Sequence, residues 1–242
     1  MFNSKVFFSA FKYSLPVLLG YLAIGTAFGL LMSNAGYSWT LALLMSVVMY
    51  AGAGQYIAVG LFASGASLVE AVIVQFVVNA RHIAYGITMF KKFNAAGICK
   101  PYMIFALTDE TFALLSSTDV DASTNASNDE SSGIRERGFF MLYVSVLNQL
   151  YWITGTLIGA FAGVFLPFNF EGVSFALSAL FIVLMIEQVL RVKKFMPFVI
   201  SAAAAILAAV ILPARVSLLS SLIAALAVVQ FFSTTKPARK ES

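Results

Sequence analysis

The chain has 242 residues, of which 60% are hydrophobic and 11% are charged. Soluble domains carry about 25% charged residues, so this composition and a mean hydropathy of +0.91 exclude a water-soluble globular protein. The net charge of +4 comes from basic residues at segment ends, without interleaved aromatic residues, so nucleic acid is not expected as a partner. One cysteine and one histidine cannot form a zinc site, and no metal or cofactor is expected.

Apolar segments that can cross a hydrocarbon core of about 30 Å recur along the chain. They lie at 13–33, 39–62, 67–90, 101–117, 138–166, 173–190, 196–212 and 217–233. Backbone polar groups need internal partners in lipid, so each segment is predicted to be a helix, complete or broken. The sequence therefore predicts an all-α, polytopic integral membrane protein with about 6–8 hydrophobic helices, arranged as a single transmembrane domain over 1–242.

The stretch from Ser116 to Gly138 is small, polar and mostly acidic, which is typical of a solvated linker. We expect a motif-bearing half at 1–116, a polar linker at 117–137 and a second helical half at 138–242. No internal repeat is apparent in the sequence. Basic residues near both ends of the chain predict an even number of crossings with both termini in the cytoplasm.

The first half presents a topological conflict. If 39–62 and 67–90 each crossed fully, Lys91 and Lys92 would lie outside, against the positive-inside bias. We therefore expect some segments of this half to be broken or re-entrant, so that the chain enters the membrane and returns. Irregular backbone at membrane depth is tolerated where protein or a water-filled cavity covers it.

Three polar clusters are candidates for a substrate-binding or transport pathway. The first contains Gly52, Gly54 and Gln55, in the middle of the 39–62 segment. Glycines weaken a helix, and the N-terminus of a broken helix attracts an anionic carboxylate. The alternative is that these glycines only allow another helix to approach closely.

The second cluster contains Asn79, Arg81 and His82, well inside the 67–90 segment. A charge at the bilayer centre costs about 2.5–3.5 kcal/mol, so Arg81 needs a partner, a cavity or a position near the interface. We favour a structural or site role for Arg81 over a merely solvated one. A lone histidine such as His82 is more often a hydrogen-bonded packing residue than a proton carrier.

The third cluster contains Asp109 and Glu110, in the 101–117 segment. Adjacent residues point about 100° apart on a helix, so only one carboxylate faces a given partner. One of them could neutralise Arg81, bind an ammonium group or take up a proton. The alternative is an interfacial helix with both acids in headgroup water. We expect the three clusters to meet in one polar pocket.

Two further features concern packing. Gly25 and Gly29 form one small-residue face, and a second face has glycine at every fourth position over 155–163. Such faces suit a neighbouring helix or a partner subunit. The amides of Asn148 and Gln149 lie in mid-segment and are expected to bond between helices.

Three ordered signatures resemble those of the AzlC family. They are Tyr50-Ala51-Gly52-Ala53-Gly54-Gln55, Val78-Asn79-Ala80-Arg81-His82-x-x-Tyr85-Gly86 and Leu107-Thr108-Asp109-Glu110-Thr111-Phe112-Ala113. The resemblance covers about residues 10–116; beyond Gly138 it rests on hydropathy and length. It implies a multi-pass protein of the bacterial inner membrane that exports branched-chain amino acids with a small AzlD-type membrane partner.

Other functional classes are less consistent with the sequence. No HExxH or GxSxG pattern occurs and the two central carboxylates are adjacent, so an intramembrane enzyme is not expected. No GxxxxGK[ST] pattern occurs, so the energy is expected to come from a gradient, most simply of protons, or from a partner. A channel-like pathway for small solutes and a membrane assembly subunit without transport of its own remain as alternatives.

Overall fold

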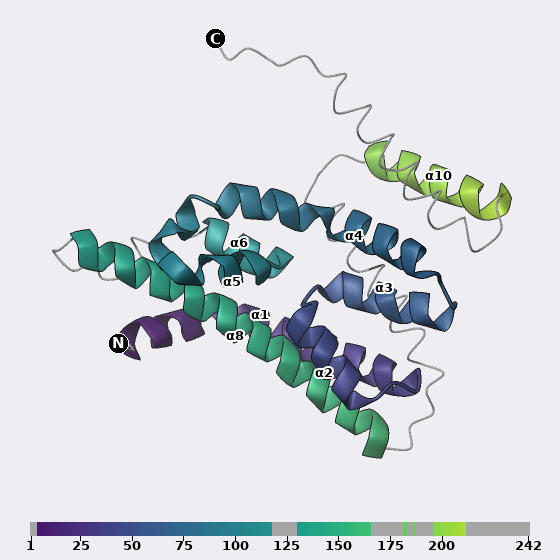
Figure 1. The fold of residues 1–242 in the computed structure, drawn as a ribbon, viewed down its shortest axis with the longest axis horizontal. Coiled ribbons are helices and arrows are strands. Elements are labelled where there is room, and N and C mark those ends of the chain that lie inside the picture. Colours follow the sequence, from purple (N-terminus) through teal and green to yellow (C-terminus); the bar gives the residue numbers. More distant parts are fainter. Residues whose placement is uncertain (1–3, 118–129, 166–181, 183–185, 187–195, 212–242) are drawn as a thin grey trace, which may run out of the picture. The chain divides into compact units, whose positions relative to one another are not determined.

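The structure is a computed structural model that describes residues 4–117, 130–165, 182, 186 and 196–211. Their elements are α1 (Ser4–Asn34), α2 (Trp39–Val48), α3 (Gly52–Ala63), α4 (Leu68–Met89), the 3-10 helix η1 (Lys92–Cys99), α5 (Lys100–Phe105), α6 (Asp109–Ser117), α8 (Glu130–Phe165) and α10 (Met196–Ile211) (Figure 1). No strand occurs within these residues. The all-α prediction is confirmed.

Two compact units make up the chain. One contains residues 1–64 and 78–174, and the other contains 65–77 and 175–242. The second unit includes α10, which matches the predicted segment 196–212. The predicted segments 173–190 and 217–233 lie outside the described residues. The first unit contains all three predicted polar clusters.

The predicted linker at 117–137 is described only in part. Residues 118–129 lie outside the described part, but 130–137 form the first two turns of α8. Good helix-forming residues at 134–137 extend the helix into the polar stretch. Because α8 packs on α1, the start of the predicted second half joins the same unit as the first half.

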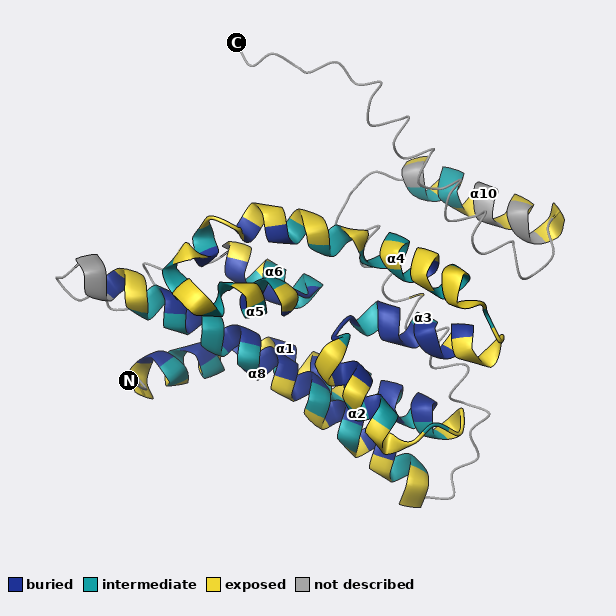
Figure 2. Ribbon diagram, viewed as in Figure 1, coloured by how far each residue is buried: buried dark blue, intermediate teal, exposed yellow. Residues whose placement is uncertain are grey.

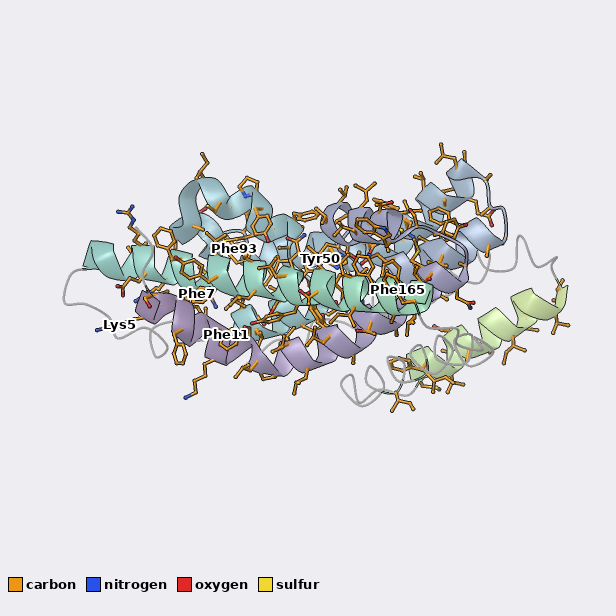
Figure 3. All side chains as sticks on the ribbon, turned by 90° about the horizontal axis from the view of Figure 1, so that it is seen from below. Lys5, Phe7, Phe11, Tyr50, Phe93 and Phe165 are labelled. Carbon is orange, nitrogen blue, oxygen red and sulfur yellow. The ribbon has the colours of Figure 1, made fainter. Side chains whose placement is uncertain are left out.

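The helices α1 and α8 run parallel and in close contact. Ring contacts between Phe7 and Tyr143 mark one end of the pair, and a Ser14–Tyr151 hydroxyl contact of 3.0 Å lies further along. At the far end Gly163 lies against Ser33. Because the residue numbers of the contacting positions increase together along α1 and α8, the two helices point in the same direction. Figure 3 shows Lys5 and Phe7 towards one end of α8 and Phe165 at the other.

The two predicted glycine faces pack against each other. A Cβ atom on Gly25 would lie 2.9 Å from the backbone oxygen of Trp152, and one on Gly155 would lie 2.8 Å from that of Tyr21. Gly29 and Gly159 approach the opposite backbone even more closely. Of the two alternatives for the 155–163 face, a neighbouring helix and a partner subunit, the structure shows the helix, because α1 of the same chain covers it.

The helices α2 and α3 form a hairpin that enters the unit and returns. They have 10 and 12 residues, or about 15 and 18 Å of helix, too short to cross a bilayer singly. The Tyr37 ring, just before α2, contacts Phe62 at the end of α3 at 5.7 Å, so both ends of the hairpin lie on one side. The Trp39 ring contacts Phe161, which places that side at the C-terminal end of α8.

The tip of this hairpin is the break that the sequence predicted. Between Val48 and Gly52 the helix stops, and Tyr50 adopts a φ of 39°, which is unusual for a residue with a side chain. Its aromatic ring is buried and lies about midway along α8 (Figure 3). The prediction of a broken segment is confirmed here, and its re-entry into the membrane stays a prediction.

A second hairpin, made of α5 and α6, enters from the opposite side. Near its first end the Lys100 ammonium lies over the Phe90 ring, and near its last end the Lys92 ammonium donates to the carbonyl of Leu115 at 2.6 Å. Gly138, early in α8, packs against the backbone of Ala95 in η1. Both ends of this hairpin therefore lie on the N-terminal side of α1 and α8.

This arrangement removes the topological conflict over the lysines. The second half of α4 runs from the middle of the unit to Lys91 and Lys92, in the direction opposite to α1. These lysines consequently lie on the same side as Lys5 and Lys12. One re-entrant hairpin between α1 and α4 is enough to satisfy the positive-inside bias.

The order of elements also repeats with inverted orientation (Figure 1). A long helix followed by a re-entrant hairpin occurs as α1–α2–α3 and again, in the opposite direction, as α4–α5–α6. Inverted-topology repeats of this kind are common in secondary transporters and place broken helices near the bilayer midplane.

Many apolar side chains of the first unit face outward. Figure 2 shows exposed residues along α4 and along the outer faces of α2 and α8, including Ile87, Val48 and Ile158. Two of the described helices, α1 and α4, are long and apolar enough to cross a membrane. Outward apolar side chains on such helices are expected where lipid is the solvent.

Candidate functional site

The start of α6 is organised by a cap from Thr108. Its hydroxyl oxygen accepts a hydrogen bond from the backbone N–H of Thr111 at 3.2 Å. Threonine is a favoured cap, and acidic residues in the first turn, here Asp109 and Glu110, stabilise the positive end of the helix dipole. This local sequence therefore breaks the predicted 101–117 helix into α5 and α6 and sets both carboxylates at the hairpin tip.

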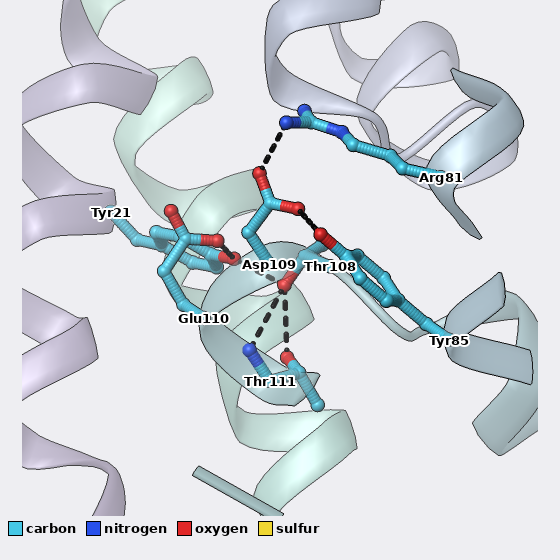
Figure 4. Close-up of polar contacts among 7 residues, drawn as sticks. All are labelled: Tyr21, Arg81, Tyr85, Thr108, Asp109, Glu110 and Thr111. Carbon is cyan, nitrogen blue, oxygen red and sulfur yellow. Dashed lines mark hydrogen bonds and ion pairs between the residues drawn. The ribbon is translucent and has the colours of Figure 1, made fainter. Parts of the chain in front are cut away.

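Asp109 forms an ion pair with Arg81. One carboxylate oxygen lies 2.7 Å from a guanidinium nitrogen, and the other accepts a hydrogen bond from the Tyr85 hydroxyl at 2.7 Å (Figure 4). The side chains of Arg81 and Asp109 are 36% and 24% exposed, so the pair is only partly enclosed. The Tyr85 ring also stacks on Phe112, with ring centroids 4.3 Å apart. These contacts join α4 firmly to α6.

Glu110 faces a different partner. Its carboxylate accepts a hydrogen bond of 2.7 Å from the Tyr21 hydroxyl, and the same hydroxyl contacts that of Thr108 (Figure 4). The two adjacent acids thus diverge, as helix geometry requires. Asp109 is paired with a cation from α4, and Glu110 is bonded to a neutral group of α1.

The Gly52–Gln55 cluster lies next to this site but has its own partners. Gln55, at the first turn of α3, donates to the Ser46 hydroxyl at 3.1 Å, which in turn contacts the Thr156 hydroxyl of α8. A Cβ atom on Gly52 would lie 3.2 Å from the Trp152 ring. Gly54 is buried within the same turn. These contacts tie the first hairpin to α8.

The structure thus brings Arg81 and Asp109 into contact, gives the adjacent Glu110 a different partner and leaves the other candidates around them. Asn79 is half-buried two residues before Arg81, and His82 packs edge-on against Tyr85 with ring centroids 5.9 Å apart. Within the described residues no group of three or more His, Cys, Asp or Glu side chains is arranged to hold a metal ion.

Several polar residues around the site were not among the candidates that the sequence offered. Tyr21 and Tyr85 hold the two carboxylates, and Asn148 donates to the Thr111 hydroxyl at 3.0 Å. Tyr50 lies at the tip of the first hairpin. A signal was present for Tyr50 and Tyr85, because both belong to the three ordered signatures, whereas Tyr21 lies in an apolar segment without a motif. The expectation that Asn148 and Gln149 bond between helices is confirmed.

Comparison with known proteins decides the family. The sequence profile described as "AzlC protein" matches residues 16–166. The chain belongs to the AzlC family. The match extends beyond the signatures of the first half through α8, the helix that closes the first unit.

Named relatives agree with this assignment. The chain is 36% identical over 188 residues to the "Branched-chain amino acid transport protein AzlC" of Bacillus subtilis, covering 78% of this chain and 70% of the relative. It is 40% identical over 187 residues to an "Uncharacterized membrane protein" of Helicobacter pylori, covering 77% of each. It is 29% identical over 183 residues to the "Inner membrane protein YgaZ" of Escherichia coli, covering 73% of this chain and 69% of the relative. No solved structure matches this chain.

Family membership and the apolar helices together identify a helical membrane protein with a role in transport. The substrate named for the Bacillus subtilis relative, the direction of transport and the partner are separate questions for this AzlC-family protein.

Proposed function

We propose that this protein is a secondary transporter that exports branched-chain amino acids across the bacterial inner membrane, driven by an ion gradient and acting with a small AzlD-type membrane partner. The observation that carries the proposal is the Arg81–Asp109 ion pair at the tip of a re-entrant hairpin, in a member of a transport family. A charged pair held among apolar helices needs a functional reason, because charges in a membrane are expensive.

The proposed pathway runs between the two hairpin tips. A zwitterionic amino acid needs donors for its carboxylate and acceptors for its ammonium group. The half-helix at Gly52–Gln55 and the guanidinium of Arg81 supply donors, and the carboxylates of Asp109 and Glu110 supply acceptors. Asn79 and His82 line the approach along α4. Burial of a branched aliphatic side chain contributes roughly 1.5–3 kcal/mol, which favours leucine or valine over glycine.

The orientation follows from the distribution of charge. Lys5, Lys12, Lys91 and Lys92 lie on one side of the first unit, which is the cytoplasmic side if the positive-inside rule holds. The first hairpin then opens to the outside and the second to the cytoplasm. The location of both termini in the cytoplasm remains a prediction, since the C-terminal residues lie outside the described part.

The proposed energy source and the proposed partner are argued from different observations. The sequence has no phosphate-binding loop, which supports a gradient, most simply of protons, as the energy source. With the 155–163 glycine face covered by α1, a partner needs another surface, and the outward apolar residues of α4, such as Ile83 and Ile87, offer one.

Amino-acid efflux tests the proposal directly. Cells lacking their own exporters are loaded with leucine, isoleucine and valine, and release is compared with and without this chain and its neighbouring small membrane protein. Faster release of these amino acids than of glycine is expected. Release that equals the empty-vector control for all of them contradicts the proposal. Leucine counterflow in vesicles separates a carrier, which shows it, from a channel-like pathway, which does not.

A further inference from the structure

Four buried polar atoms at the centre of the first unit lack a hydrogen-bond partner among the described residues. They are the Tyr50 hydroxyl, Gln55 Oε1, Asn148 Oδ1 and Trp152 Nε1. Tyr50 and Trp152 are 3% exposed, and Gln55 and Asn148 are fully buried. Buried polar groups in proteins are nearly always bonded, so four such atoms in one region call for an explanation.

The four side chains are neighbours in space. The Trp152 ring packs edge-on against Tyr21 with centroids 5.4 Å apart, and Asn148 bonds to Thr111. The Tyr50 hydroxyl lies near those of Tyr21 and Thr111, without the geometry of a hydrogen bond to either. Tyr21 and Thr111 therefore link Tyr50 to Trp152 and to Asn148.

The remaining side chain, Gln55, is linked through the tip of the first hairpin. Gly52 packs against the Trp152 ring, and Gln55 follows it by three residues, within the same helical turn. The Gln55 amide nitrogen bonds to the Ser46 hydroxyl, which can donate as well as accept, so the amide can turn over to present either oxygen or nitrogen. The cluster thus extends from the start of α3 to the start of α6.

Both hairpin tips direct a helix N-terminus to this region. The first turn of α6 is capped by Thr108, whereas Ala51 gives α3 no side-chain cap. The N-terminus of α3 therefore keeps its partial positive charge available to an anionic group. On the other side of the cluster, the Glu110 carboxylate supplies negative charge.

We propose that the side chains of Tyr50, Gln55, Asn148 and Trp152 bind the carboxylate and ammonium groups of a zwitterionic amino acid between the two hairpin tips. The set contains the donors of Tyr50 and Trp152 and the acceptors of Asn148 and Gln55, so it matches both ends of such a ligand. It is uncharged overall, as the ligand is. This inference rests on the proposed transport function, gives Gln55 a role in binding and adds Tyr50, Asn148 and Trp152 to the pathway.

The same atoms provide a sharp test, because a side-chain atom without a partner is not needed for folding. Replacing an unbonded hydroxyl leaves no broken hydrogen bond in the unliganded protein. Tyr50→Phe should therefore leave the thermal stability of the purified full-length chain unchanged. Tyr151→Phe is the matched control, since the Tyr151 hydroxyl is bonded to Ser14 and its loss should lower stability.

Binding is measured with radiolabelled leucine on both variants and the unaltered chain, each purified together with the neighbouring small membrane protein. Tyr50→Phe should raise the Kd for leucine roughly 10- to 100-fold, the range for a lost hydrogen bond to a charged group. Tyr151→Phe should leave the Kd unchanged. Leucinamide, which lacks the carboxylate, and 4-methylpentanoate, which lacks the ammonium group, should both compete at least 10-fold less well than leucine.

Each outcome has one meaning. An unchanged Kd in Tyr50→Phe, or competition by leucinamide or 4-methylpentanoate as strong as by leucine, overturns this inference alone. A fall in stability of Tyr50→Phe equal to that of Tyr151→Phe also overturns it, because the hydroxyl is then structural. Absence of leucine binding by the unaltered chain overturns the proposed function as well.

Discussion

Neutralising the Arg81–Asp109 ion pair one side at a time and then together separates its structural role from its role in transport. Arg81→Gln leaves the Asp109 carboxylate with only the Tyr85 hydroxyl, and Asp109→Asn leaves the guanidinium without its carboxylate. The double variant removes both charges and keeps side chains that can bond to each other. The three variants form a double-mutant cycle.

The structure sets the expected size of the effect. Each single variant leaves one charge among membrane helices, which costs about 2.5–3.5 kcal/mol at the bilayer centre. Since the two side chains are 36% and 24% exposed, the lower end of that range, about 2.5 kcal/mol, is appropriate. That is roughly a 60-fold shift from folded to misfolded protein. We expect the double variant to recover most of this loss, so that its total loss lies well below the roughly 5 kcal/mol to which two independent losses would add.

Two readouts complete the experiment. Folded protein in the membrane is measured by fluorescence-detected size exclusion, and leucine efflux is normalised to that amount. We expect efflux to be lost in all three variants, even where the double variant restores folding. Lys12→Gln, which removes an exposed charge outside the ion pair, is the control and should change neither readout. If the loss of folded protein in the double variant equals the sum of the two single losses, the ion pair is refuted. If the double variant shows native efflux, the role of the pair in the pathway is refuted.

Three further predictions use other parts of the first unit. Gly159→Leu, which meets the α1 backbone, should abolish folded protein in size exclusion, whereas Gly20→Leu, with open space around it, should not; equal yields contradict the tight α1–α8 contact. In a Cys99→Ser background, Ala63→Cys should react with an impermeant thiol reagent added outside, because the 39–62 segment is proposed to enter the membrane and return. Ile98→Cys should react only after the membrane is permeabilised. The reverse pattern would mean that 39–62 and 67–90 each cross the membrane fully. The purified chain alone in liposomes should show little leucine counterflow, and rapid counterflow excludes the need for a partner.

The first hairpin and the ion pair were within reach of sequence reasoning. Glycines at positions 52 and 54 marked the break, and an intramembrane arginine required a counter-ion that only a few acids could supply. Their geometry agrees with this reasoning. The energetic cost of a charge in lipid indicated that Arg81 needs a counter-ion or a cavity, and only the structure shows that Asp109 and not Glu110 is the counter-ion.

The second hairpin and the inverted repeat could not be predicted in the same way. No glycine marks the break before Asp109. The predicted helix is interrupted there because Thr108 caps a new helix, and a capping threonine is too common in sequences to predict a break. The repeat rests on the direction of helices and shares no motif between its halves. Small-residue faces are equally compatible with a neighbouring helix and another subunit, so the role of Gly155 was settled only by its contact with α1.

The parallel contact between α1 and α8 has a consequence for biogenesis. The two helices are separated by almost a hundred residues, so the ribosome adds roughly 100 residues after α1 before α8 can reach it. At about 5–20 residues per second this takes roughly 5–20 s. During that interval the glycine-lined face of α1 cannot pack on α8, so only lipid or the insertion machinery can contact it. Synonymous mutations that slow synthesis between these helices should therefore increase degradation without altering any residue of the finished protein.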